Sequence, residues 1–468
     1  MNLDLDYADA VDLRRRIGAK EISPVELTRR ALEKAERTQA TLNAFFVLTP
    51  EAAMRAARNA EDAVMKGAPL GPLHGLPFSV KDLIAVGGLP YASGSRATRD
   101  VVAEADAPAV ERAKRAGAIV IGKTTTSEFG CKPTGDSPLT GVTRNPWNLG
   151  KTPGGSSAGA AASVAAGITP FALGTDGGGS VRIPSGFTGL VGFKGHFGRV
   201  PVWPVSATPT LAHVGPLART VRDCALLFSA IAGYDPRDPF SVAGLVPDVM
   251  AACDSPLPAL RIAWSPTLGY ARPDTEVVAI CGRAARRFEE LGCVVEQVDK
   301  VFASDPADLW TAEFYAGVGT RLRGIVEGQR DLLDPAVAEV LEAALGQEMR
   351  DYYTKVFARY ALRERMRLFF GDYDLLLSPV SPVTSLDVGK DIPDHLADRN
   401  LVSWVFYTYP INLIGHPAAS VCAGIAADGM PVGLQIVGRA LGEYEVVRAA
   451  AAFERLSSPG YNVKRYEA

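Results

Sequence analysis

Short apolar segments alternate with helical patterns along this chain, and this alternation constrains the fold more than any other feature. Three segments are strand-like: LPFSVKDLIAV (76–86), GAIVIGK (117–123) and FALGTD (171–176). The helical pattern APAVERAKRAG (107–117) lies between the first two, and the first 66 residues are also helical in pattern. Such alternation is typical of layered α/β folds. We therefore predict a single α/β/α domain in which helices flank a large mixed β-sheet.

The chain has 468 residues, and its texture changes in the middle. We expect one domain over 1–468, with a catalytic core at about 70–230 and 408–457. The region 234–400 is predicted to be a variable helical elaboration that shapes the substrate pocket. It holds two strand-like segments and the long helical pattern DYYTKVFARYALRERMRLFF (351–370). Near the C-terminus, HPAASVCAGI and PVGLQIVG flank AADGMP, which is typical of a hairpin connection.

The charge balance limits the classes of partner. The chain carries 49 Lys and Arg against 52 Asp and Glu, a net charge of −3, which argues against a nucleic acid or a membrane surface. Its first residues lack the basic and then apolar order of a secretory signal. Six cysteines at irregular spacing indicate reduced thiols. We expect a cytoplasmic protein with no nucleic acid and no membrane among its partners.

The segment 153–186 holds five serines among many glycines and no histidine. Hydroxyls beside glycine-rich backbone indicate a nucleophile next to amide donors. Part of it, GSSAG, fits the G-x-S-x-G nucleophile elbow with Ser157 at its centre. That elbow needs an apolar strand before it, and RNPWNLGKTPG is a loop pattern instead. We therefore do not expect a Ser-His-Asp hydrolase.

A second motif, GAIVIGKT (117–124), fits the phosphate-binding pattern G-x-x-x-x-G-K-[ST]. Here the four residues between the glycines are themselves the apolar strand, and a helix precedes them. They cannot also wrap a phosphate, so we do not expect nucleotide binding.

Without a histidine, the serine needs another base. Lys81 is a candidate because it lies in an apolar strand, where burial would favour the neutral amine. The alternative is an edge lysine that reaches solvent along its apolar stem.

Taken together, these segments resemble the amidase signature family. The resemblance is carried by LPFSVKDLI, GKTTTSEFG, NPWNLGKTPGGSSAGAAASVAAG, GTDGGGSVRIPS and the tail PINLIGHPAASVCAG…GMPVGLQIVG. It implies a Ser–cis-Ser–Lys triad with Ser180 as nucleophile, Ser156 as bridging serine and Lys81 as base. It also implies that the Gly155–Ser156 peptide bond is cis. Position 158 departs from the family, since Ala158 stands where many members have glycine.

The resemblance further implies an oxyanion hole built by backbone amides of Gly177, Gly178 and Gly179, with that of Ser180 beside them. Asp176 and Arg182 look like the family's structural ion pair, and Ser157 like a supporting hydrogen-bond partner. Gly130 and Cys131 are expected near the scissile bond. Aromatic candidates for the substrate pocket lie in the middle region: Trp310, Phe314, Tyr315, Tyr352, Tyr353 and Phe357.

The function implied is hydrolysis of amide C–N bonds through an acyl-enzyme on Ser180, without a metal or organic cofactor. The aromatic middle region favours aryl amides or carbamates (urethanes) as substrates, with broad specificity, for a monomer or homodimer. Two alternatives stay open: the amidase subunit of a tRNA-dependent amidotransferase, and a non-catalytic binding protein that has kept the fold.

Overall fold

The structure is a computed structural model that describes residues 4–456 and residue 466. Within these residues, eleven strands form one mixed sheet in the order β1-β3-β2-β6-β8-β7-β12-β13-β11-β9-β10. They are β1 (Phe45–Leu48), β2 (Pro77–Lys81), β3 (Ile119–Thr124), β6 (Phe171–Asp176), β7 (Val191–Lys194), β8 (His213–Ala218), β9 (Arg261–Trp264), β10 (Val294–Gln297), β11 (Leu375–Pro379), β12 (Ala418–Ile425) and β13 (Pro431–Gly438). A separate pair joins β4 (Asp136–Ser137) to β5 (Gly141–Val142).

Helices pack on both faces of this sheet. One face is covered by α1 (Ala10–Gly18), α4 (Pro108–Arg115), α7 (Val221–Ile231), α8 (Val249–Asp254), α9 (Thr275–Arg286) and α15 (Glu443–Leu456). The opposite face is covered by α5 (Ala158–Ala165), α6 (Arg182–Thr188) and α14 (Tyr409–Ile414). This three-layer arrangement confirms the predicted α/β fold class.

The strand sequences explain why both faces are covered. In β6, Phe171 and Leu173 pack into the core on one face, and Ala172 packs against α5 on the other. In β11, Leu375 and Leu377 point to the first face and Leu376 to the second. Successive side chains of a strand alternate between faces, so a continuous apolar run is buried on both sides.

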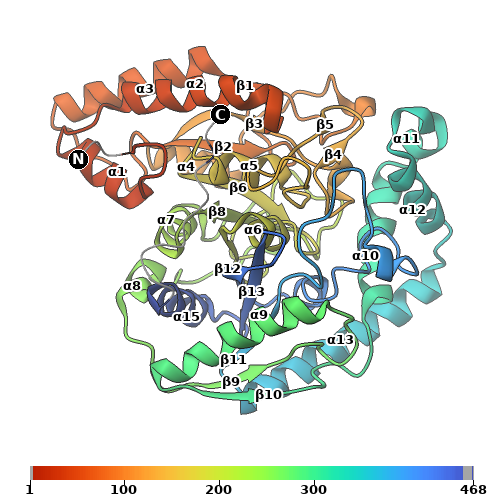
Figure 1. Cartoon of the computed structure of the whole chain (residues 1–468). Coiled ribbons are helices and arrows are strands. Elements are labelled where there is room, and N and C mark those ends of the chain that lie inside the picture. The colour runs from red at the N-terminus through yellow and green to blue at the C-terminus, as the bar shows by residue number, and fades with distance from the viewer. Residues whose placement is uncertain (1–3, 457–465, 467–468) are drawn as a thin grey trace.

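The N-terminal helices α2 (Pro24–Leu42) and α3 (Pro50–Met65) lie side by side next to β1 at one end of the molecule (Figure 1). Ser23 caps α2 as the sequence predicts, because its hydroxyl accepts hydrogen bonds from the amides of Val25 and Glu26. The predicted hairpin is also present, since β12 pairs with β13 in antiparallel register.

The middle region does more than add helices, because β9, β10 and β11 extend the sheet at the edge opposite β1. Its helices are α10 (Ala307–Arg321), α11 (Arg323–Gly328), α12 (Pro335–Leu345) and α13 (Met349–Asp372). Figure 1 shows α10, α11 and α12 grouped at one side of the molecule, beyond the sheet. Short 3₁₀ turns complete the described elements: η1 (Arg96–Thr98), η2 (Glu128–Gly130), η3 (Arg287–Leu291), η4 (Arg330–Leu332) and η5 (Asp394–Leu396).

Two sequence motifs take the structures expected of them. GAIVIGKT leads from α4 directly into β3, so its middle residues are strand and not a phosphate loop. GSSAG lies between a loop and α5, with no strand running into it. None of the helices within the described residues has the length and apolar character needed to cross a membrane.

Candidate active site

Lys81 is the last residue of β2, and its side chain is fully buried. The strand runs between β3 and β6 near the middle of the sheet, which carries the amine into the interior instead of to an edge. Its Nζ lies 2.7 Å from Ser156 Oγ, 3.0 Å from Ser157 Oγ and 2.9 Å from Thr175 Oγ1. The amine is therefore surrounded by three hydroxyls, and the alternative of a lysine that reaches solvent is wrong.

Burial lowers the pKa of Lys81 well below 10.5, and the nearby carboxylate of Asp176 opposes this only in part. A neutral amine has two N–H groups and one lone pair, so it donates two hydrogen bonds and accepts one. Ser157 Oγ is 3.2 Å from the carbonyl oxygen of Thr175 and donates its proton there, so it accepts from Lys81. Ser156 is left as a hydroxyl that can give its proton to the lone pair.

The two candidate catalytic serines come from different turns. Ser156 precedes α5, and the Gly155–Ser156 peptide bond is cis, as the family resemblance implies. A side chain at Gly155 would collide with the backbone of Thr134, so this position requires glycine. Ser180 lies in the turn between β6 and α6. The amide of Ser157 donates to the carbonyl of Ser180 at 3.3 Å, which ties the two turns together.

The glycine turn before Ser180 is held by its carbonyls. Trp310 Nε1 donates to the carbonyl of Gly177 at 2.8 Å, and Thr408 Oγ1 donates to that of Gly178 at 2.6 Å. In a planar trans peptide the N–H points away from the C=O of the same unit. The bond from Trp310 therefore turns the N–H of Gly178 to the opposite side.

One of the three predicted oxyanion donors must be corrected. The amide of Gly179 already donates to Asp176 Oδ1 at 2.8 Å, and one N–H cannot serve two strong acceptors well. The amides of Gly177, Gly178 and Ser180 donate no hydrogen bond to any other described residue. These three are the N–H groups that remain to stabilise an oxyanion.

Asp176 and Arg182 form an ion pair in which neither side chain is exposed. Two bonds of 2.9 Å join them, and Arg182 lowers the pKa of the carboxyl well below its usual range. Asn412 and Gln435, from the C-terminal part of the chain, complete the guanidinium's partners at 2.6 Å each. The pair holds the turn that carries Ser180, since Asp176 also accepts from the amides of Gly179 and Val181.

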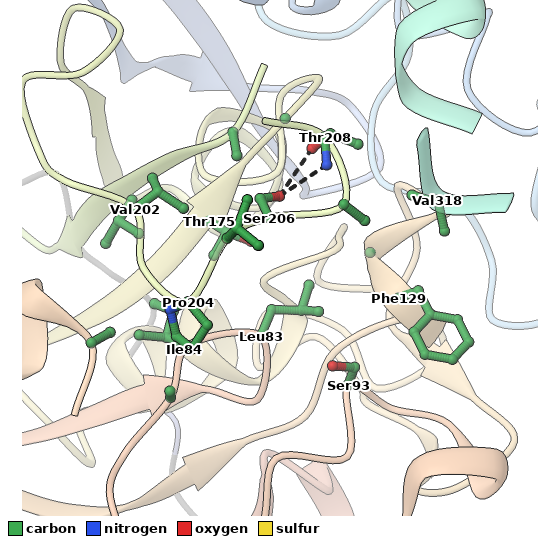
Figure 2. Close-up of a pocket in the computed structure, with 18 of the residues that line it drawn as sticks. Leu83, Ile84, Ser93, Phe129, Thr175, Val202, Pro204, Ser206, Thr208 and Val318 are labelled. Carbon is green, nitrogen blue, oxygen red and sulfur yellow. Dashed lines mark hydrogen bonds between the residues drawn. The ribbon is translucent and has the colours of Figure 1, made fainter. Parts of the chain in front are cut away.

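Ser156 and Ser180 both line one cavity of about 250 Å³, together with Thr175, Gly177 and Gly130. Most of its wall is apolar. Figure 2 shows Phe129 and Val318 on one side of this cavity and Ile84, Val202 and Pro204 on the other. Tyr91, Phe129, Trp203 and Phe314 supply its aromatic side chains. The reacting hydroxyls therefore face a space suited to an apolar or aryl group.

The residues expected to bind substrate divide into two groups. Gly130 lines the cavity, whereas Cys131 is fully buried and points into the core, and it is not among the lining residues. Burial also raises the pKa of the Cys131 thiol, so it is not a nucleophile at neutral pH.

The aromatic candidates of the middle region divide in the same way. Phe314 lines the cavity and stacks on Trp310, with 4.4 Å between ring centroids. Tyr315 is buried, and its hydroxyl donates to the carbonyl of Cys131. The interpretation of the other three, Tyr352, Tyr353 and Phe357, is wrong. They lie on α13 away from the cavity, because that helix turns other residues toward the core.

Comparison with known proteins places this geometry in a family. The family model described as Amidase matches residues 26–447. The chain belongs to the amidase signature family. An acylamidase of Rhodococcus erythropolis is 35% identical over 96% of both chains. The amidase-type subunit of the glutamyl-tRNA(Gln) amidotransferase of Moorella thermoacetica is 36% identical over 99% of both. The crystal structure of a bacterial aryl acylamidase of the family superposes with a TM-score of 0.92, at 31% identity and with 99% of each chain covered.

Membership in the amidase signature family gives the class of reaction. The chain is a hydrolase of carbon–nitrogen bonds other than peptide bonds. Over the described residues, no group of three or more His, Cys, Asp or Glu side chains is placed to hold a metal ion.

Several residues of this amidase site were missed from the sequence. Thr175 contacts Lys81, and it directly precedes Asp176 in the segment GTDGGGS, so its position was a usable signal. Thr408 and Trp310 act through contacts more than 100 residues along the chain from the glycine turn. No local sequence signal marks such contacts.

Proposed function

We propose that this amidase hydrolyses aryl amides and carbamates, with broad specificity, through an acyl-enzyme on Ser180 and a Ser180–Ser156–Lys81 triad. The observation that carries the proposal is the hydrogen bond of 2.7 Å between the buried amine of Lys81 and Ser156, whose hydroxyl shares the cavity with Ser180.

In the proposed acylation step, Ser180 Oγ attacks the carbonyl carbon of the substrate. Its proton passes to Ser156 Oγ, and the proton of Ser156 passes to the lone pair of Lys81 Nζ. The carbonyl oxygen becomes an oxyanion, which the amides of Gly177, Gly178 and Ser180 stabilise. Each such donor contributes about 3 kcal/mol in comparable sites.

Collapse of this intermediate breaks the C–N bond, and Lys81 returns its proton through Ser156 to the departing amine. Water then enters the vacated place, gives up a proton along the same path and attacks the ester carbonyl. Ser180 leaves with that proton, and the carboxylic or carbamic acid is released. A carbamic acid decomposes to an amine and carbon dioxide. No other reactant is needed.

The apolar wall and four aromatic side chains of the cavity support an aryl or otherwise apolar substrate. The names of two relatives, an acylamidase and an aryl acylamidase, agree with this choice. Carbamates share the trigonal carbonyl and the C–N bond of amides, so the same attack applies to them.

A second candidate is the amidase subunit of a tRNA-dependent amidotransferase. The similarity to the Moorella thermoacetica amidotransferase chain, 36% over 99% of both chains, favours it. That function needs a partner that receives ammonia. The chain purified alone would then hydrolyse aryl amides poorly.

A panel of an anilide, an aryl carbamate and a short aliphatic amide tests the proposal on the purified chain. We expect turnover of the two aryl substrates, with Ser180→Ala inactive. Ser163→Ala is the matched control, because Ser163 is a buried serine of the same segment that lies outside the cavity. Turnover of the aliphatic amide alone, or of none of the three, would reject the proposed substrates.

A further inference from the structure

The substrate cavity has one formally charged side chain in its wall. Of the residues that line it, Arg321 is the sole member of the Lys, Arg, Asp and Glu set. The guanidinium is exposed and has neither an ion pair nor a hydrogen bond to another described residue. The wall therefore offers an unpaired positive charge and no negative charge to a bound molecule.

Helix α10 sets the distance from this charge to the reacting centre. Phe314, Val318 and Arg321 follow one another at helical spacing and all line the cavity. The ring of Phe314 lies against Gly177, where an added Cβ would be 2.9 Å from it. Arg321 comes about two turns later, so it lies about 10 Å further along the helix axis. The cavity thus has a reacting end at the glycine turn and a cationic end at Arg321.

We propose that Arg321 forms an anion subsite, which selects aryl amide or carbamate substrates that carry a carboxylate remote from the scissile bond. This deepens the proposed function and rests on it. A guanidinium binds a carboxylate through two parallel N–H···O bonds, and the apolar wall beside it reduces screening by water. Since no acidic side chain lines the cavity, a cationic substituent finds repulsion and no partner there.

A structural role for Arg321 makes a different prediction. The residue lies in the last turn of α10, where a cation is favoured by the helix dipole. If that were its role, removing the charge would change stability and would affect all substrates alike. A subsite instead changes the ranking of substrates by charge.

The test compares three para-substituted acetanilides that differ in charge: 4-acetamidobenzoate, its methyl ester and 4-acetamidobenzylamine. For the wild type we expect kcat/KM to be highest for the benzoate and lowest for the benzylamine. Arg321→Gln should reduce the ratio of benzoate to ester by about two- to fivefold, the usual range for a partly exposed ion pair. Added salt should reduce the wild-type ratio in the same direction.

The matched control is Arg323→Gln, which removes a nearby exposed charge that pairs with Glu327 and does not line the cavity. This variant should keep the wild-type ratio. An unchanged ratio in Arg321→Gln, or an equal loss in both variants, would overturn the proposal.

Binding measurements separate the subsite from the proposed function. In Ser180→Ala, calorimetry should find tighter binding of 4-acetamidobenzoate than of its ester, and Arg321→Gln added to that variant should remove the difference. If no anilide is hydrolysed by the wild type, the proposed function fails, and this binding difference still decides the subsite. Equal binding of the two probes in Ser180→Ala overturns it.

Discussion

At the scale of single residues, the chemistry depends on a lysine that the fold keeps away from water. Lys81 has three hydroxyl partners and no carboxylate within hydrogen-bond distance among the described residues. An ion pair would hold the amine in its charged form, whereas hydroxyls and burial favour the neutral form. The same environment that prepares Lys81 as a base therefore lowers the stability of the folded chain wherever the unfolded chain would bind the proton.

The variant Lys81→Met tests this cost. Between the lowered pKa of folded Lys81 and its ordinary value of 10.5, the unfolded chain binds more protons than the folded chain. The contribution of Lys81 to the free energy of unfolding therefore rises with pH. The methionine lacks this contribution, so we expect it to stabilise the chain at pH 7 and to lose that advantage toward pH 10. Activity should fall by about 10³-fold or more.

Urea unfolding of both proteins at several pH values measures the difference, with Lys66→Met as a control at an exposed site. A stability difference between Lys81→Met and the wild type that does not vary with pH would contradict the lowered pKa.

The bond from Trp310 to Gly177 gives a second prediction. Trp310→Phe keeps a ring in place but removes the N–H that orients the peptide unit of Gly178. Removal of an oxyanion donor costs about 10²-fold in kcat, and a misaligned donor costs less, so we expect a loss of about tenfold in kcat with little change in KM.

Tyr315→Phe is the comparison for Trp310→Phe, because it removes a hydrogen bond from the same helix to Cys131 instead. Steady-state kinetics on an anilide should leave its kcat near that of the wild type. Equal losses of kcat in the two variants would mean that α10 acts only through packing.

Sequence reasoning found the positions of Lys81, Ser156 and Ser180 because short motifs carry them, and the structure brings Lys81 beside Ser156 and both serines to one cavity. It assigned Gly179 incorrectly because a run of three glycines does not reveal which N–H is already bonded. That information lies in the contact with Asp176, which depends on the φ and ψ angles of the turn.

At the scale of elements, caps and apolar runs predicted most boundaries. The prediction failed for α13, where Tyr353 and Phe357 were taken as pocket residues and are instead 52% and 69% exposed. Helical spacing shows that residues share a face, but not which face meets the core. For α13 that choice is made by Arg359 and Met366, which are the buried residues of the helix.

The cap of α2 gives a prediction at this scale. Ser23→Ala removes the acceptor for the amides of Val25 and Glu26, so we expect a loss of about 1 kcal/mol in the free energy of unfolding. Glu348→Ala, at the N-cap of α13, removes a side chain that makes no cap bond and should cost less than half as much. Denaturant unfolding of both variants checks this, and equal losses would argue against the cap.

At the scale of the whole molecule, the sheet assembles the site from distant parts of the chain. Lys81 arrives on β2, Ser180 follows β6, and Arg182 is bound by Asn412 and Gln435 from the C-terminal elements. Alternating patterns predicted the layers, but the strand order was not predictable, because hydrophobic patterns do not specify which strands pair. We propose that the chain forms one domain, since β9, β10 and β11 of the middle region continue the same sheet.

Mass spectrometry of the protein quenched during turnover of an aryl carbamate tests the central claim most directly. The account predicts one covalent acyl group, located on Ser180 by peptide mapping. That group should be absent from Ser180→Ala and strongly reduced in Lys81→Met. An acyl group on Ser156 or Ser157, or full labelling without Lys81, would contradict the proposed triad.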